Sequence, residues 1–151
     1  MRRSAALVVV ALVVAGCGGS KHAGAPTTAL LTGVRAGGTE VTFTFRSAPQ
    51  HVTTAYTKKS QVAEAGSGRP VAIGAPAVVV VHFTPAATGE ATGTGVKLSY
   101  DGPRRLAGTG PVRDVVKISD FEADVGWALG LDRRLPVHVS RDGSTVTVSF
   151  G

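Results

Sequence analysis

Residues 39–46 read TEVTFTFR, and residues 144–150 read STVTVSF. In both stretches a large apolar side chain occupies every second position, so one side of an extended chain is apolar and the other is polar. Val, Phe and Thr are the residue types that suit a pleated surface with one buried face. Residues 141–144 (RDGS) predict a tight turn, because Gly143 adopts a positive φ at no steric cost. A hairpin over residues 137–150 is therefore expected at the end of the chain.

Similar short segments recur along the chain, and clusters of Gly, Pro or Asp separate them. Residues 77–84 (AVVVVHFT) are apolar on both faces, which predicts a central strand covered on two sides. Residues 58–76 are long for a connection and are expected to fold back through Val71 and Ile73, whereas residues 85–95 (PAATGEATGTG) are expected to form a mobile hairpin loop. Short strands that recur at this spacing, with turn residues between them, predict a sandwich or a barrel. The further expected strands cover residues 29–35, 52–57, 96–100, 112–119 and 125–131.

The N-terminal residues combine a positive start, an apolar run and a cysteine. Arg2 and Arg3 precede the apolar residues 5–15, and small residues lie directly before Cys17. The run is shorter than the roughly 20 apolar residues that cross a bilayer, so a permanent transmembrane segment is not expected. The resemblance to bacterial lipoprotein signals implies that residues 1–16 are a signal peptide and that Cys17 carries a diacylglycerol. The protein would then be exported and lipid-anchored on the extracytoplasmic face of the cell membrane. A plain secretory signal with an incidental cysteine is the alternative.

The rest of the chain divides into a tether and one domain. Residues 17–27 are rich in Gly and Ala and lack an apolar period, so they are expected to form a flexible tether. Residues 28–151 suit one domain, which packing alone must stabilise because no other cysteine is present. Removal of residues 1–16 leaves 14 basic and 10 acidic side chains, a net charge of +4. These charges are spread along the chain with few aromatic residues, so nucleic-acid binding is not expected.

Residues 120–132 (DFEADVGWALGLD) alternate large apolar side chains with residues that have almost no side chain. A strand with such a bare face lets another backbone, a side chain or a ligand approach closely. Either neighbouring side chains fill that space, or a small ligand binds there. Trp127 is the only tryptophan, and its ring suits stacking on a sugar, although a tryptophan in an apolar strand is more often part of a core.

Three stretches resemble the actinobacterial AMIN-like lipoproteins: GSGRPVAIGAPAVVVVHFTPA at residues 66–86, GPRRLAG at residues 102–108 and VVKISDFEADVGWALGLDRRLPVHV at residues 115–139. The most distinctive part is SDFEADVGWALGLDRR. AMIN domains are β-sandwiches that accompany cell-wall amidases and secretins and help to place them on peptidoglycan. The resemblance therefore implies an all-β, single-domain antiparallel β-sandwich over residues 28–151 that acts as a non-catalytic envelope module. No hydrolase domain accompanies it here, so amidase activity is not expected.

The residues themselves contain no catalytic pattern. A hydrolase needs a nucleophile paired with a base, or a metal held by several ligands. Asp120, Glu122 and Asp124 would share one face of a straight strand and make a weak cation site, but a solvated turn is the favoured interpretation. We therefore predict no enzymatic activity, no catalytic residue, no metal and no cofactor. The histidines occur singly, as His22, His51, His82 and His138.

Two basic doublets flank the distinctive segment. Guanidinium groups suit the carboxylates and phosphates of wall polymers or lipids, so Arg104, Arg105, Arg133 and Arg134 are the predicted binding residues, together with Trp127. The leading hypothesis is a membrane-anchored module that recognises cell-wall glycan or an envelope protein. The second is an assembly subunit that pairs through an exposed sheet edge. The third is a small-ligand carrier or enzyme that uses the bare face of residues 125–131.

Overall fold

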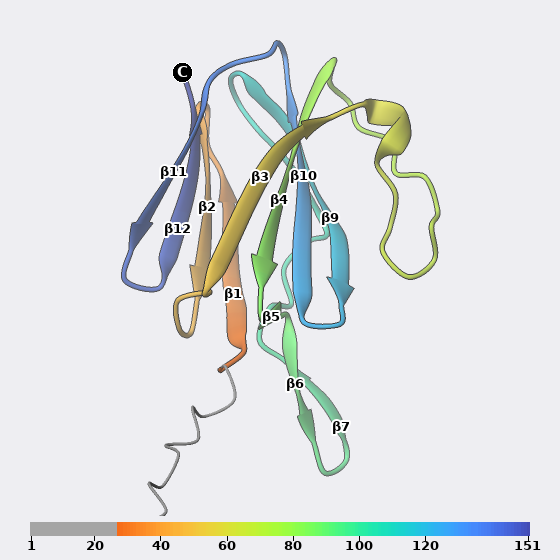
Figure 1. Cartoon of the computed structure of the whole chain (residues 1–151), viewed down its shortest axis with the longest axis vertical. Helices are drawn as coiled ribbons and strands as arrows, with labels where there is room; N and C mark the ends of the chain where they lie inside the picture. The colour runs from red at the N-terminus through yellow and green to blue at the C-terminus, as the bar shows by residue number, and fades with distance from the viewer. Residues whose placement is uncertain (1–26) are drawn as a thin grey trace, which may run out of the picture.

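The computed structural model describes residues 27–151, and Figure 1 shows two β-sheets packed face to face. One sheet has the strand order β11-β12-β2-β1-β5 and the other β3-β4-β10-β9-β8, while β6 and β7 form a separate hairpin. The predicted all-β sandwich is confirmed. The strands are β1 Ala29–Ala36, β2 Glu40–Phe45, β3 His51–Thr57, β4 Ala77–Thr84, β5 Ala86–Ala87, β6 Gly89–Thr92, β7 Gly95–Leu98, β8 Arg105–Ala107, β9 Val112–Phe121, β10 Asp124–Leu131, β11 Val137–Asp142 and β12 Thr145–Phe150.

Neighbouring strands are antiparallel, with one exception. β1 pairs in parallel with the two-residue strand β5, through Ala29 with Ala86 and Leu30 with Ala87. The C-terminal hairpin forms as predicted, with Val137 opposite Phe150 and with Gly143 at φ +54° in its turn. The end of the sandwich where β1 begins is called the proximal end below.

The main core lies between the two sheets and follows the alternation in the sequence. Phe43 and Phe83 are fully buried, and their ring centroids lie 4.8 Å apart. The centroid of Trp127 lies 6.0 Å from that of Phe43. Tilted aromatic contacts at these separations are favourable beyond the area they bury. The apolar positions of β2, β4, β10 and β12 therefore face one another across the sandwich.

A second, smaller core covers the outer face of the β3-β4-β10-β9-β8 sheet. Residues 58–76, called the covering segment, include the short 3₁₀ helix Lys59–Gln61 and fold back onto this face. Val62 and Ile73 are buried there against Val78 and Ala128. This explains why β4 is apolar on both faces, and it confirms that the segment returns to the sheet.

The sequence missed three short strands. Residues 85–95 were expected to be a mobile hairpin loop, and they do form part of a hairpin, because β6 pairs with β7 from Gly89 opposite Leu98 to Thr92 opposite Gly95; the strand β5 was not expected. β8 pairs with β9 through Arg105 opposite Val116. Each of these strands has four residues or fewer, which is too short to show an alternating pattern. Pairing with a neighbouring strand therefore determines their conformation more than their own residue types do.

The lipoprotein signal over residues 1–16, Cys17 and most of the tether lie outside the described residues. Among residues 27–151, no helix has the length and apolar character needed to cross a membrane.

Candidate functional site

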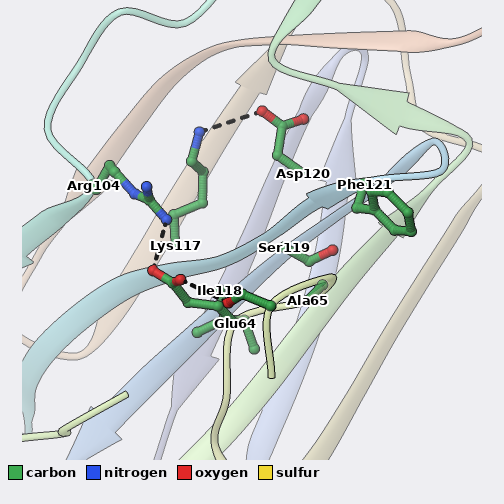
Figure 2. Close-up of a pocket in the computed structure, with 9 residues that line it drawn as sticks. Glu64, Ala65, Arg104, Lys117, Ile118, Ser119, Asp120 and Phe121 are labelled. Carbon is green, nitrogen blue, oxygen red and sulfur yellow. Dashed lines mark hydrogen bonds and ion pairs between the residues drawn. The ribbon is translucent and has the colours of Figure 1, made fainter. Parts of the chain in front are cut away.

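A hollow of about 320 Å³, called the β9 pocket, lies where the covering segment meets β9. Figure 2 shows Glu64 facing Arg104 and Lys117 reaching toward Asp120. The ring of Phe121, which is 53% exposed, stands at its rim. Two positive and two negative side chains therefore share one small concave surface. Its lining residues are Glu64, Ala65, Ser67, Arg104, Lys117, Ile118, Ser119, Asp120 and Phe121.

Glu64, which belongs to the covering segment, contacts Arg104, one of the two basic residues of the pocket. Its Oε2 accepts hydrogen bonds from Arg69, at 2.8 Å, and from Ser67, at 3.1 Å. Its Oε1 accepts a longer bond of 3.3 Å from Arg104. The hydrogen bonds from Arg69 and then Ser67 hold the pKa of the Glu64 carboxyl below its ordinary value. Glu64 therefore stays ionised at neutral pH, and Arg69 holds it even when Arg104 is engaged elsewhere.

Lys117 and Asp120 form the second charged pair of the pocket, with 3.4 Å between Nζ and Oδ2. The Lys117 side chain is only 14% exposed, so most of its length is covered by the protein. Asp120 also accepts hydrogen bonds from the backbone N–H and the hydroxyl of Thr88, which is buried. Asp120 thus links the pocket to the base of the β6–β7 hairpin.

A tight turn before β8 positions Arg104. The hydroxyl of Tyr100 donates a 2.7 Å hydrogen bond to the carbonyl of Pro103. A Cβ at Gly102 would lie 2.7 Å from the Tyr100 ring, so only glycine fits beside it. Burial raises the pKa of the Tyr100 hydroxyl above its ordinary value, and the charge of Asp101 acts in the same direction. The Arg104 side chain remains 64% exposed, which leaves its guanidinium open to a ligand.

Arg105 has a different environment from its neighbour. Its guanidinium donates to Asp114 at 2.9 Å and to the carbonyl of Ala72 at 2.6 Å. The Asp114 side chain is only 9% exposed and also accepts a 2.9 Å bond from the N–H of Gly74. Arg105 therefore holds the covering segment against the sheet.

The second doublet lies in the connection between β10 and β11. Arg133 contacts the adjacent Asp132 at 3.4 Å, and Arg134 lies 4.0 Å above the ring of Tyr56. Tyr56 in turn donates a 2.6 Å bond to the carbonyl of Leu135 and accepts one from its N–H. Of the four arginines, only Arg104 lines the β9 pocket. The structure does not bring the four predicted arginines together in one pocket.

Trp127 belongs to the core and does not reach the surface. It is fully buried and packs against Phe43 and, at 5.8 Å between centroids, against Tyr100. Its burial confirms the core interpretation of this tryptophan, and its ring is not accessible for stacking on a sugar in this structure.

Side chains fill the bare face of β10. A Cβ at Gly130 would lie 2.8 Å from both Ile73 and Ala75 of the covering segment. A Cβ at Gly126 would lie 2.8 Å from the ring of His82. Gly126 and Gly130 therefore make room for close packing, and a small ligand has no space over this face. The β9 pocket lies on the neighbouring strand and not over this face of β10.

The residues that resemble a catalytic set do not form one. His82 bonds Asp124 at 2.9 Å, a pair that the sequence did not reveal because the two residues lie 42 positions apart. Ser119 lies close by, but its hydroxyl donates to the backbone carbonyl of Asp124 at 3.0 Å. Within residues 27–151, no serine, threonine or cysteine is hydrogen-bonded to a histidine. The acid–base pairing that activates a nucleophile is therefore absent from this part of the chain.

The acidic residues around the β9–β10 turn bind separate partners and do not converge on one site. Asp120 pairs with Lys117, and Asp124 pairs with His82. Glu122 occupies the turn itself, at φ +52°, as the turn interpretation predicted. No group of three or more metal-ligating side chains occurs in the described range.

Arg104 was predicted from the sequence and lines the β9 pocket, but its partner Glu64 and the nearby Lys117 were not singled out, and Asp120 was considered only for a weak cation site. A partial signal was present, because the covering segment was expected to fold back and it carries Glu64, Ser67 and Arg69 within six residues. The surface of β9 onto which it folds depends on the arrangement of strands in the sheet, which residue patterns did not specify.

The fold and the β9 pocket define a small all-β sandwich module with a charged surface hollow. The AMIN-like domain family matches residues 28–148. The chain therefore belongs to the AMIN-like domain family. No curated protein and no solved structure matches the chain.

Proposed function

We propose that this protein is an exported, lipid-anchored and non-catalytic module of the cell envelope that binds peptidoglycan through the β9 pocket. In this proposal residues 1–16 are removed, Cys17 carries the lipid, residues 17–27 act as a tether and residues 28–151 are the binding domain. Membership of the AMIN-like family supports the envelope role.

The observation that carries the proposal is the paired charge of the β9 pocket. Arg104 and Lys117 suit a carboxylate, while Glu64 and Asp120 suit an ammonium group. The peptide stems of peptidoglycan carry both kinds of group close together. A ligand bearing both signs would match this surface better than a polyanion would, because a polyanion would be repelled by the two carboxylates.

The ion pairs within the pocket do not prevent such binding. Arg104 is 64% exposed and its bond to Glu64 is long, at 3.3 Å. Exposed ion pairs of this kind contribute only about 0–1 kcal/mol, so a ligand carboxylate can replace Glu64 at little cost. Glu64 would keep its bonds to Arg69 and Ser67. The exposed ring of Phe121 would add an apolar contact at the rim.

Pelleting of the detergent-solubilised full chain with isolated peptidoglycan sacculi tests the proposal. The wild type should pellet in a salt-sensitive way, and Arg104→Ala should weaken binding by about tenfold through loss of a charged contact. Arg133→Ala is the matched control, since Arg133 is equally exposed, at 65%, but lies outside the pocket. Soluble wall fragments whose stem carboxylates are amidated should compete less well than unmodified ones. Failure of the wild type to pellet would remove the peptidoglycan-binding role.

The lipid anchor is tested separately. The intact mass of the full chain isolated from its own membrane should correspond to a chain that begins at a lipid-modified Cys17. An unmodified thiol at Cys17 would remove the anchor from the proposal.

A second candidate function is assembly with an envelope protein through a sheet edge. β11 is an edge strand, and most of its residues are exposed. An extended segment of another protein can add to such an edge through main-chain hydrogen bonds. Crosslinking from positions on β11, with a protein partner recovered after wall digestion, would favour this function over glycan binding.

A further inference from the structure

The β6–β7 hairpin projects beyond both sheets at the proximal end of the sandwich (Figure 1). Val96 and Leu98 are 69% and 61% exposed, the highest values among the large apolar residues of the described chain. They lie on the same face, because side chains two positions apart in a strand point the same way. Ala91 is opposite Val96 in the pairing and extends this apolar face.

The other face of the hairpin is polar and is fixed to the sandwich. Glu90 forms an ion pair with Arg46 at 3.2 Å. At the base, the hydroxyl of Ser99 donates a 2.8 Å bond to the carbonyl of Leu31, and the backbone of Thr88 accepts from Ser99 at 2.9 Å. The hairpin is therefore held in a defined direction, with its apolar face turned away from these contacts.

The path of the chain places the start of β1 beside this hairpin. The N–H of Ala29 donates a 2.9 Å bond to the carbonyl of Pro85, and Ala29 pairs with Ala86, three residues before the start of the hairpin strand β6. The N–H of Ala86 also donates to Ala123 of the β9–β10 turn. The exposed ring of Phe121 lies at that turn. Three of the four exposed large apolar residues of the described chain thus lie in elements that meet at the proximal end.

We propose that the tip of the β6–β7 hairpin inserts into the surface of the lipid bilayer through Val96 and Leu98. The inference rests on the proposed anchor at Cys17. The chain from Cys17 to Ala29 spans 12 residue steps, and covalent geometry limits its reach to about 40 Å. A lipid at Cys17 would therefore keep the proximal end next to the membrane.

The dimensions of the hairpin fit this arrangement. Its four residue pairs, from Gly89 with Leu98 to Thr92 with Gly95, extend about 13 Å from the sandwich. That length lies well within the reach of the connecting chain. Lys97 lies between Val96 and Leu98 on the opposite face, where its long side chain can extend to lipid phosphates while its neighbours enter the apolar region.

Fluorescence quenching by brominated lipids tests the inference. Leu98→Trp and the control Val139→Trp are made in the full chain and added to vesicles of phosphatidylcholine and phosphatidylglycerol with brominated acyl chains. Val139 is also an exposed apolar residue, at 41%, but it lies on β11. Trp127 is fully buried and contributes the same background to both variants. We expect quenching at position 98 to be at least about threefold stronger than at position 139.

The intact mass of the same samples separates the two proposals. Equal quenching at both positions, or none at position 98, with lipid on Cys17 overturns the hairpin inference and leaves the anchor in place. Strong quenching at position 98 with an unmodified thiol supports membrane contact by the hairpin and removes the anchor. Absence of both signals overturns both.

Discussion

The covering segment and the β6–β7 hairpin are both additions to the two five-stranded sheets, yet their aliphatic side chains have opposite environments. Ile73 of the covering segment is 4% exposed, whereas Val96 of the hairpin is 69% exposed. The covering segment lies on a sheet face, and the hairpin extends beyond the sheets (Figure 1). Residue type alone does not distinguish the two.

The difference lies in what each segment meets. The covering segment lies against Ala128 and Gly130 of β10, whose small size leaves space for Ile73 and Ala75. Arg105 and Asp114 then hold it in place by hydrogen bonds to its backbone. The hairpin satisfies its backbone by pairing with itself and meets no sheet face. An apolar side chain is buried only where the tertiary structure provides a complementary surface.

The largest expected effect comes from comparing Ile73→Ala with Leu98→Ala. The first variant empties part of the outer core and should lower the free energy of unfolding by about 2–3 kcal/mol. The second removes an exposed side chain and should change it by less than about 0.5 kcal/mol. Urea unfolding of the two full-length variants measures both values. Equal losses would mean that the hairpin packs against the domain in solution and that the contrast is wrong.

An intermediate effect is expected from the two adjacent arginines. Arg105→Ala leaves the nearly buried Asp114 without its charged partner and should lower stability by about 1–3 kcal/mol. Arg104→Ala breaks only an exposed ion pair and should cost less than about 1 kcal/mol. Arg105→Ala should also speed tryptic cleavage after Lys59, because the covering segment is released. Similar cleavage rates in both variants would contradict the positioning role of Arg105.

The smallest effect is expected on acidification. The folded state lowers the pKa of Glu64, so its contribution to stability is present above the ordinary glutamate pKa and is lost as the pH falls through the lowered value. Amide exchange in the covering segment should therefore increase in that acidic range, and Glu64→Gln should remove this dependence. A carboxyl NMR titration measures the pKa directly. A value at or above that of a free glutamate would contradict the bridging role of Glu64.

Much of the fold could be predicted from residue patterns. The predicted strand 77–84 has the same bounds as β4, and the C-terminal hairpin forms with its glycine turn. The hairpin depends on contacts between sequence neighbours, whereas the apolar run of β4 reflects burial on both of its faces. The short strands β5, β6 and β8 were missed because they consist of two to four residues, among them glycine and alanine, which have weak strand preference.

The candidate site was less predictable. Arg104 was identified, but its bond to Glu64 joins residues 40 positions apart. Arg105 has a structural role in holding the covering segment, and Trp127 lies in the core. Arg133 contacts Asp132, and Arg134 contacts Tyr56. None of these four residues lines the β9 pocket. Residue type indicated which groups can bind a carboxylate but not which of them were free to do so.

The sequence by itself determined an all-β chain, the face of each long strand that enters the core and the turns that join the C-terminal strands, because these follow from a period of two residues and from local backbone freedom. The tertiary structure alone decided that Glu64, Arg104, Lys117 and Asp120 share a pocket and that Val96 and Leu98 stay exposed. Those outcomes depend on contacts between distant segments. Such contacts are set by strand order and by the space that small residues leave on a sheet, and no local pattern encodes either.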